Sequence, residues 1–178
     1  MKKMKHNIAA FFCAMIILGL SAAYATADGE QEKLQIAEPI QEYTSMDLSP
    51  YRGKALFLNF FTEWCPYCMQ EMDSIREIHE QYDPEAFQVI LVHVWDGEDA
   101  SNTESIKRRF GMQDMTFYED EKAEVFRALG FQGYPTSLFL DQEGFLSQYH
   151  SGPLSREAMA SAVESMGVTR LQAGEGVQ

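Results

Sequence analysis

Two cysteines separated by two residues, Cys65 and Cys68, are the side chains in this sequence best suited to redox chemistry. They stand in the segment CPYC, after an apolar run and at the start of a helical pattern. A thiol at a helix N-terminus faces unpaired backbone N–H groups and the positive end of the helix dipole, which lower its pKa and favour the thiolate. Cys65 therefore has the position of a nucleophile. Cys68, one turn further on, is close enough to attack a mixed disulfide on Cys65 and release the partner.

Metal binding and a purely structural disulfide explain the pair less well. A zinc site uses about four ligands, and the other candidates outside the N-terminal segment are His79, His93 and His150, none at a paired spacing with the cysteines. His93 also falls in a predicted buried strand, where a core role is expected. A structural disulfide that closes so small a loop would add little stability. We therefore expect a reversible Cys65–Cys68 disulfide, with no metal and no other cofactor.

The first 27 residues have the pattern of a signal peptide. Three lysines among the first five residues precede an apolar stretch from about Ile8 to Leu20, and Ala25-Thr26-Ala27 matches a cleavage site. The alternative is an uncleaved anchor, because Ile8 to Ala25 is about long enough to span a bilayer. Cleavage would remove Cys13. Either way the folded part is expected outside the cytoplasm, in a periplasm or on the extracytoplasmic face of the membrane.

The sequence is acidic, with 14 Lys and Arg residues against 27 Asp and Glu residues in 178, a net charge of −13. Loss of the three N-terminal lysines would leave 11 basic residues and a net charge of −16. Such a surface repels nucleic acid and anionic lipid headgroups. We interpret it mainly as a solubilising surface; the alternative is a preference for basic partners.

The remaining chain fits one domain in which strands and helices alternate. After a tether and edge segment over residues 28–45, the domain is expected to span residues 46–168 and to end in a disordered tail over residues 169–178. Continuous apolar runs predict buried strands, and apolar residues at steps of three and four predict helices. Strands are expected at 54–61, 87–95, 115–118, 135–141 and 145–152, and helices at 65–81, 101–111, 120–130 and 155–167. This order predicts an α/β fold with a central mixed sheet and helices on both faces.

Two segments carry a specific resemblance: ALFLNFFTEWCPYC at residues 55–68 and GYPTSLFLDQEG at residues 133–144. They resemble the thioredoxin superfamily, and residues 58–72 are most similar to its exported TlpA/ResA-like branch. The similarity covers about Leu48 to Met166 and includes the inserted helix and strand of that branch, here around residues 101–118. The resemblance implies a thioredoxin-like fold. It also implies a cis bond between Tyr134 and Pro135, with Pro135 beside the cysteines.

The resemblance also names an acid–base residue. Cytoplasmic thioredoxins carry a buried Asp where this chain has Asn59, which cannot titrate, whereas the exported branch places a Glu three residues after the second Cys. That residue is Glu71, a candidate for moving the thiol proton; the alternative is a solvated surface glutamate. Glu63 is interpreted as a surface residue. Asp73 replaces a proline that is frequent in the branch, which puts the helix kink of that branch in doubt.

The residues expected to contact a partner protein are Trp64, Pro66, Tyr67, Tyr134 and Pro135. The three aromatic side chains would form an apolar rim around the cysteines. The backbone beside Pro135 would pair with an extended segment of the substrate.

We therefore predict an exported, monomeric thiol–disulfide oxidoreductase that reduces disulfides in exported proteins. In the related branch, electrons come from a membrane thiol carrier and go to apocytochrome c or another oxidised protein; the many methionines raise a methionine sulfoxide reductase as a variant partner. A disulfide-forming oxidant would use the same residues, and only the reduction potential separates the two. A peroxidase would carry a PxxxTxxC motif, which is absent. A non-enzymatic copper carrier would have a longer cysteine spacing and a nearby histidine.

Overall fold

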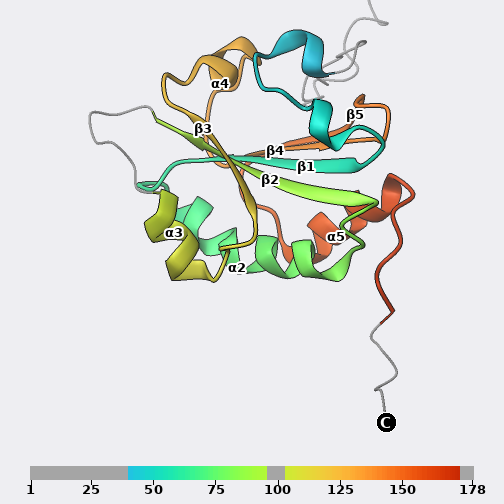
Figure 1. The fold of residues 1–178 in the computed structure, drawn as a ribbon. Helices are drawn as coiled ribbons and strands as arrows, with labels where there is room; N and C mark the ends of the chain where they lie inside the picture. The colour runs from blue at the N-terminus through green and yellow to red at the C-terminus, as the bar shows by residue number, and fades with distance from the viewer. Residues whose placement is uncertain (1–39, 96–102, 173–178) are drawn as a thin grey trace, which may run out of the picture. The chain divides into compact units, whose positions relative to one another are not determined.

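The computed structural model describes residues 40–95 and 103–172 (Figure 1). Four predicted features lie wholly or largely outside these ranges: the signal peptide, most of the tether over residues 28–45, the first two residues of the helix expected over residues 101–111, and residues 173–178 of the tail. Within the described ranges, no helix is both long and apolar enough to cross a membrane.

A five-stranded mixed sheet forms the centre of the described region, in the order β3-β2-β1-β4-β5. β1 lies in the middle and all seven of its residues are buried, as its continuous apolar sequence predicts. It pairs parallel with β2 and antiparallel with β4. β3 extends the parallel part and β5 the antiparallel part. The strands are β1 Ala55–Phe61, β2 Phe87–Val94, β3 Thr116–Asp120, β4 Thr136–Leu140 and β5 Leu146–Ser151.

Helices cover both faces of this sheet (Figure 1). Three lie on one face: α2 Pro66–Gln81, α3 Thr103–Phe110 and α5 Arg156–Ser165. On the other face lie α4 Glu124–Ala128 and two 3-10 turns, η1 Ile40–Tyr43 and η2 Ser49–Tyr51. Alternate β1 residues point to opposite faces and join separate apolar clusters, so that Phe57 and Phe61 pack with α2 while Leu58 and Phe60 pack with α4. Asn59 shares the face of Phe57 and Phe61, which places its side chain under α2.

The predicted fold class is confirmed, including the inserted helix and strand, which are α3 and β3. One element differs from the prediction: α4 has five residues, whereas a helix over residues 120–130 was expected. Asp120, the first residue of the expected helix, instead ends β3, and the next three residues form a turn in which Ala123 has φ 52°. The Asp120 carboxylate then accepts the Val125 and Phe126 N–H groups at 3.2 and 2.9 Å, which caps the short helix. α2 runs unbroken through Asp73.

The chain after α5 returns to the end of α2. Arg170 forms an isolated antiparallel β-bridge with Tyr82, and the Leu171 N–H donates to the Gln81 carbonyl at 2.8 Å. The Arg170 guanidinium also pairs with Glu164 at 2.5 Å. These contacts fall within the segment that was predicted to be a tail from residue 169 onward.

Candidate active site

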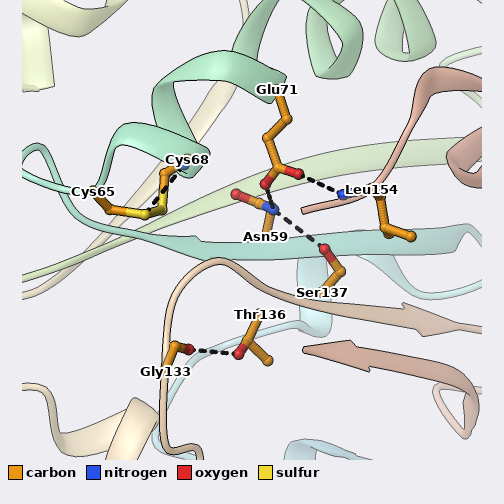
Figure 2. The surroundings of a disulfide bond; sticks show 8 residues. All are labelled: Asn59, Cys65, Cys68, Glu71, Gly133, Thr136, Ser137 and Leu154. Atoms are coloured by element: carbon orange, nitrogen blue, oxygen red, sulfur yellow. Dashed lines mark hydrogen bonds between the residues drawn. A yellow bond between two sulfur atoms is a disulfide. The ribbon is translucent and has the colours of Figure 1, made fainter. Parts of the chain in front are cut away.

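The cysteine pair lies where β1 passes into α2. β1 ends at Phe61, a three-residue loop follows, and Cys65 is the N-cap of α2 with Pro66 in the first turn. The Cys65 sulfur accepts the Cys68 N–H at 3.1 Å, and the two cysteines form a disulfide (Figure 2). Cys65 retains 3% exposure and Cys68 none. The helix N-terminus therefore points at Cys65, as the spacing predicted.

Two exposed aromatic side chains, Trp64 and Tyr67, stand on either side of Cys65 in the chain. Trp64 and Tyr67 are 66% and 58% exposed, although large aromatic groups are ordinarily buried. The Trp64 ring meets the half-buried Tyr134 edge-to-face, with centroids 5.8 Å apart. Tyr134 in turn stacks on Phe126 of α4 at 4.5 Å. The structure thus brings Trp64 and Tyr134 together and leaves an exposed apolar rim at the start of α2.

The Tyr134–Pro135 bond is cis, as the resemblance implied. Pro135 is buried, and its carbonyl accepts the Gly152 N–H at 2.8 Å. The Thr136 hydroxyl donates to the Gly133 carbonyl at 2.7 Å (Figure 2). These two hydrogen bonds hold the loop where it passes into β4.

Glu71 is buried, with 3% exposure, and does not lie on the solvated face of α2. Its carboxylate accepts the Asn59 Nδ2 at 2.8 Å and the Leu154 N–H at 3.0 Å (Figure 2). Burial raises the pKa of Glu71 to about 7, while these two hydrogen bonds oppose the rise. Glu71 lies one helical turn after Cys68. It therefore has the position and the pKa of a group that exchanges a proton near neutral pH.

Two hydrogen-bond partners were missed in the sequence: the Leu154 N–H, which binds Glu71, and the Ser137 hydroxyl, which binds Asn59. The Leu154 N–H reaches Glu71 from a loop 83 residues away, and no sequence signal points to it. Ser137 accepts a second hydrogen bond from Asn59 Nδ2 at 3.2 Å. A signal for Ser137 did exist: an Asn inside an apolar strand needs buried polar partners, and the register of β1 and β4 sets Asn59 opposite Ser137.

A surface groove of about 660 Å³ runs beside Glu71, between α2 and the loop that leads into α5. Arg156 and Glu77 both line this groove, and the Arg156 guanidinium pairs with the Glu77 carboxylate at 2.9 Å. Tyr67 of the aromatic rim and the buried Glu71 both line this groove. Its lining residues are Tyr67, Gln70, Glu71, Ser74, Glu77 and residues 153–157.

His93 belongs to the packing of β2 and not to the cysteine pair. It is buried, stacks on Phe61 with ring centroids 4.7 Å apart, and its Nδ1 lies 2.9 Å from the Thr103 hydroxyl. Burial lowers its pKa, with Glu119 and Glu63 opposing the shift. His93 therefore ties α3 to the sheet. In the described part of the chain, no group of three or more His, Cys, Asp or Glu side chains is arranged to hold a metal ion.

A cysteine pair at the N-terminus of a helix, a cis-proline loop beside β4, and this sheet order define a thiol–disulfide oxidoreductase of thioredoxin-like fold. Residues 30–166 match the model of the Redoxin family. The chain belongs to the Redoxin family.

Curated relatives carry the same activity in their names. The chain is 31% identical over 119 residues to the thiol-disulfide oxidoreductase ResA of Geobacillus thermodenitrificans, covering 67% of each chain. It is 28% identical to the ResA of Bacillus cereus, over 83% of this chain and 91% of that one. It is 25% identical to the sporulation thiol-disulfide oxidoreductase A of Bacillus subtilis, over 84% and 93% of the two chains.

Solved structures support the same fold. A putative thiol:disulfide interchange protein DsbE from Chlorobium tepidum matches with a TM-score of 0.58 and 26% identity, over 68% of this chain and 85% of that one. A putative thioredoxin from Neisseria meningitidis matches with a TM-score of 0.60 and 23% identity, over 68% and 80% of the two chains.

Proposed function

We propose that this protein is exported and reduces disulfide bonds in other exported proteins. Cys65 is the nucleophile, Cys68 is the resolving cysteine, and Glu71 moves the proton. The observation that carries the proposal is the buried Glu71 carboxylate, one turn from Cys68, with a pKa raised to about 7.

The reaction begins when the Cys65 thiolate attacks one sulfur of a substrate disulfide. The other substrate sulfur leaves as a thiolate and takes up a proton. Cys68 then loses its proton to Glu71, and its sulfur attacks Cys65. The bond between Cys65 and the substrate breaks, and the second substrate sulfur leaves as a thiolate that takes up a proton. Two electrons and two protons pass to the substrate, and the Cys65–Cys68 disulfide remains. A dithiol donor, proposed to be a membrane thiol carrier, returns the pair to the reduced state.

The charges near the pair support the proposed direction of electron flow. Strong oxidants gain a high potential by stabilising the thiolate of the reduced form. No Lys, Arg or His occurs between residues 55 and 75, whereas Glu63 and Glu71 do. Carboxylates oppose the effect of the helix dipole and keep the thiol pKa from falling far. A less stable thiolate means a more stable disulfide, and therefore a more reducing pair.

The proposed partners are oxidised exported proteins, among them apocytochrome c or a methionine sulfoxide reductase. Such a partner would lie on Trp64, Pro66, Tyr67 and Tyr134, and would pair with the backbone beside Pro135. The two exposed aromatic rings support this surface, because exposed apolar groups around a reactive site favour a protein partner. The signal-like pattern of residues 1–27 supports export to a periplasm or to the outer face of the membrane. We propose that the thioredoxin-like domain spans residues 46–168.

Equilibration of the full chain against glutathione or dithiothreitol tests the direction. We expect a potential nearer to the thioredoxin value of about −270 mV than to the exported-oxidant value of about −120 mV. A potential above about −180 mV would overturn the reductase proposal and leave the cysteine roles standing. Mass spectrometry of protein recovered from the extracytoplasmic fraction tests export, with cleavage after Ala27 as the expected result.

A further inference from the structure

The buried side-chain oxygen Asn59 Oδ1 has no hydrogen-bond partner within the described ranges. Two other buried side-chain atoms there share this property, Thr62 Oγ1 and His79 Nδ1. A hydroxyl group can rotate and an imidazole can change tautomer, whereas the oxygen of an amide whose nitrogen is already bound has a fixed direction. Asn59 has no exposed surface. An unpaired buried acceptor costs free energy, so a partner is expected in some state of the protein.

The direction of Oδ1 is set by the other end of the amide. Asn59 Nδ2 donates to Glu71 at 2.8 Å and to Ser137 at 3.2 Å. In its ionised form Glu71 only accepts hydrogen bonds, and in that form the NH₂ group is the end of the amide that faces it. The oxygen then points the other way along α2, and Figure 2 shows it directed toward the Cys65–Cys68 disulfide. Cys68 precedes Glu71 by one helical turn, on the side toward which the Asn59 oxygen is directed in Figure 2.

The redox state changes what Cys68 can offer to this oxygen. Neither sulfur of the disulfide carries a hydrogen. Reduction by a dithiol adds two electrons and two protons, breaks the S–S bond and leaves one S–H on each cysteine. Cys65 can ionise at the helix N-terminus, while Cys68 has no exposed surface. The Cys68 S–H is then a buried donor without water to bind.

We propose that in the reduced protein the Cys68 thiol donates a hydrogen bond to Asn59 Oδ1. This proposal rests on the proposed role of Cys68 as the resolving cysteine. The hydrogen bond exists only in the dithiol state, so Asn59 distinguishes the two redox states at the buried cysteine.

The hydrogen bond has two consequences for the reaction. A partner that accepts from the thiol favours its protonated form, so Cys68 stays protonated while Cys65 is the thiolate. The same amide donates to Glu71, so the thiol and the carboxylate are both hydrogen-bonded to one polar group. A change of charge at either of them then polarises the hydrogen bond to the other. Reduction also satisfies an acceptor that the disulfide leaves unpaired, so Asn59 shifts the equilibrium toward the dithiol.

The equilibrium with dithiothreitol tests the second consequence in the full chain. Asn59→Leu removes the acceptor at similar volume, and we expect the equilibrium to shift toward the disulfide by about three- to tenfold. Ser137→Ala removes only the other partner of the amide and should shift it less than twofold. The Asn59→Leu shift should persist in a Glu71→Gln background, because it acts through Cys68. A shift below twofold in both backgrounds would overturn the proposal.

Infrared spectroscopy tests the hydrogen bond itself and does not depend on the folding of Asn59→Leu. Cys13→Ser with Cys65→Ala leaves Cys68 as the single thiol of the chain. A hydrogen-bonded S–H bond is weaker, so its stretching band should lie at lower wavenumber in the folded protein than in urea. A band at the same position in both would overturn the proposal. If the band shifts but Cys68→Ala fails to trap partners, the hydrogen bond stands and the resolving role fails.

Discussion

At the scale of single residues, Cys65 and Cys68 differ in what can reach them. Cys65 stands in the chain next to Trp64 and two residues before Tyr67, whose rings are exposed, and Cys68 follows one turn later with no exposed surface. An incoming disulfide can therefore meet Cys65 but not Cys68. We expect Cys68→Ala to accumulate mixed disulfides with partner proteins, because the resolving sulfur is missing. Cys65→Ala should accumulate few.

Trapping of these species on non-reducing gels, with release by dithiothreitol, measures the difference. Alkylation of the reduced protein at mildly acidic pH provides an independent check, since the thiolate reacts and the thiol does not. Equal labelling of the two cysteines, or trapping through Cys65→Ala alone, would reverse the assignment.

The raised pKa of Glu71 predicts a pH dependence of stability. The folded protein holds this proton up to about pH 7, whereas an unfolded chain releases it near the ordinary value of 4.5. Stability therefore falls as the pH rises through this window, and the loss is complete above the folded-state pKa. Between about pH 4 and about pH 8, the free energy of unfolding of the wild type should fall by roughly 3 kcal/mol relative to Glu71→Gln.

Urea unfolding at several pH values measures this difference. The comparison cancels the titration of other groups, including His93, whose lowered pKa acts in the opposite direction. Gln leaves one hydrogen bond poorly matched, which adds an offset that does not depend on pH. A constant difference across the window would show that Glu71 ionises as an ordinary surface carboxylate.

At the scale of elements, α4 depends on a single capping carboxylate. Asp120 accepts two N–H groups of a helix with only five residues, and that helix carries Phe126, on which Tyr134 stacks. We expect Asp120→Ala to lower the free energy of unfolding by about 2 kcal/mol, because it leaves two buried N–H groups without an acceptor.

Glu124→Ala is the matched control, because Glu124 is exposed on the same helix. It should change stability by less than about 0.5 kcal/mol. The near-ultraviolet circular dichroism of Asp120→Ala should also weaken as the stack on Tyr134 loosens. An effect no larger than that of Glu124→Ala would remove Asp120 as the cap.

At the scale of the whole molecule, the net charge of −13 should select among partners. Fields of one sign raise the association rate of oppositely charged partners, and salt screens this effect. We expect a basic disulfide-containing peptide to be reduced about tenfold faster than an acidic peptide of equal length at low ionic strength. The ratio should approach one at about 1 M salt.

Stopped-flow Trp fluorescence of the reduced protein would measure both rates, since Trp64 lies beside Cys65. A neutral peptide with the same disulfide provides the control for intrinsic reactivity. Equal rates for all three peptides at low salt would mean that the acidic surface serves solubility alone.

The sequence by itself determined the strands, most helices and the cysteine pair, because these features depend on short-range patterns. Apolar runs of strand length became β1 and β2, and the two-residue cysteine spacing placed Cys65 as the N-cap of α2. Glu71 was identified through resemblance, but spacing left open whether it was buried or solvated. The predicted length of α4 was wrong, since a local helix pattern does not reveal that Asp120 ends a strand.

Only the tertiary structure decided the environment of the site. The contacts that surround Glu71 and Asn59 join residues 12, 78 and 83 positions apart, so they exist only once the sheet, α2 and the loop before α5 are packed together. Burial of Glu71, and with it a pKa of about 7, follows from that packing and from no property of the surrounding sequence. The unpaired oxygen of Asn59 is likewise invisible in the sequence, because the direction of the amide is set by the partners of its nitrogen, Glu71 and Ser137, which only the packing brings together.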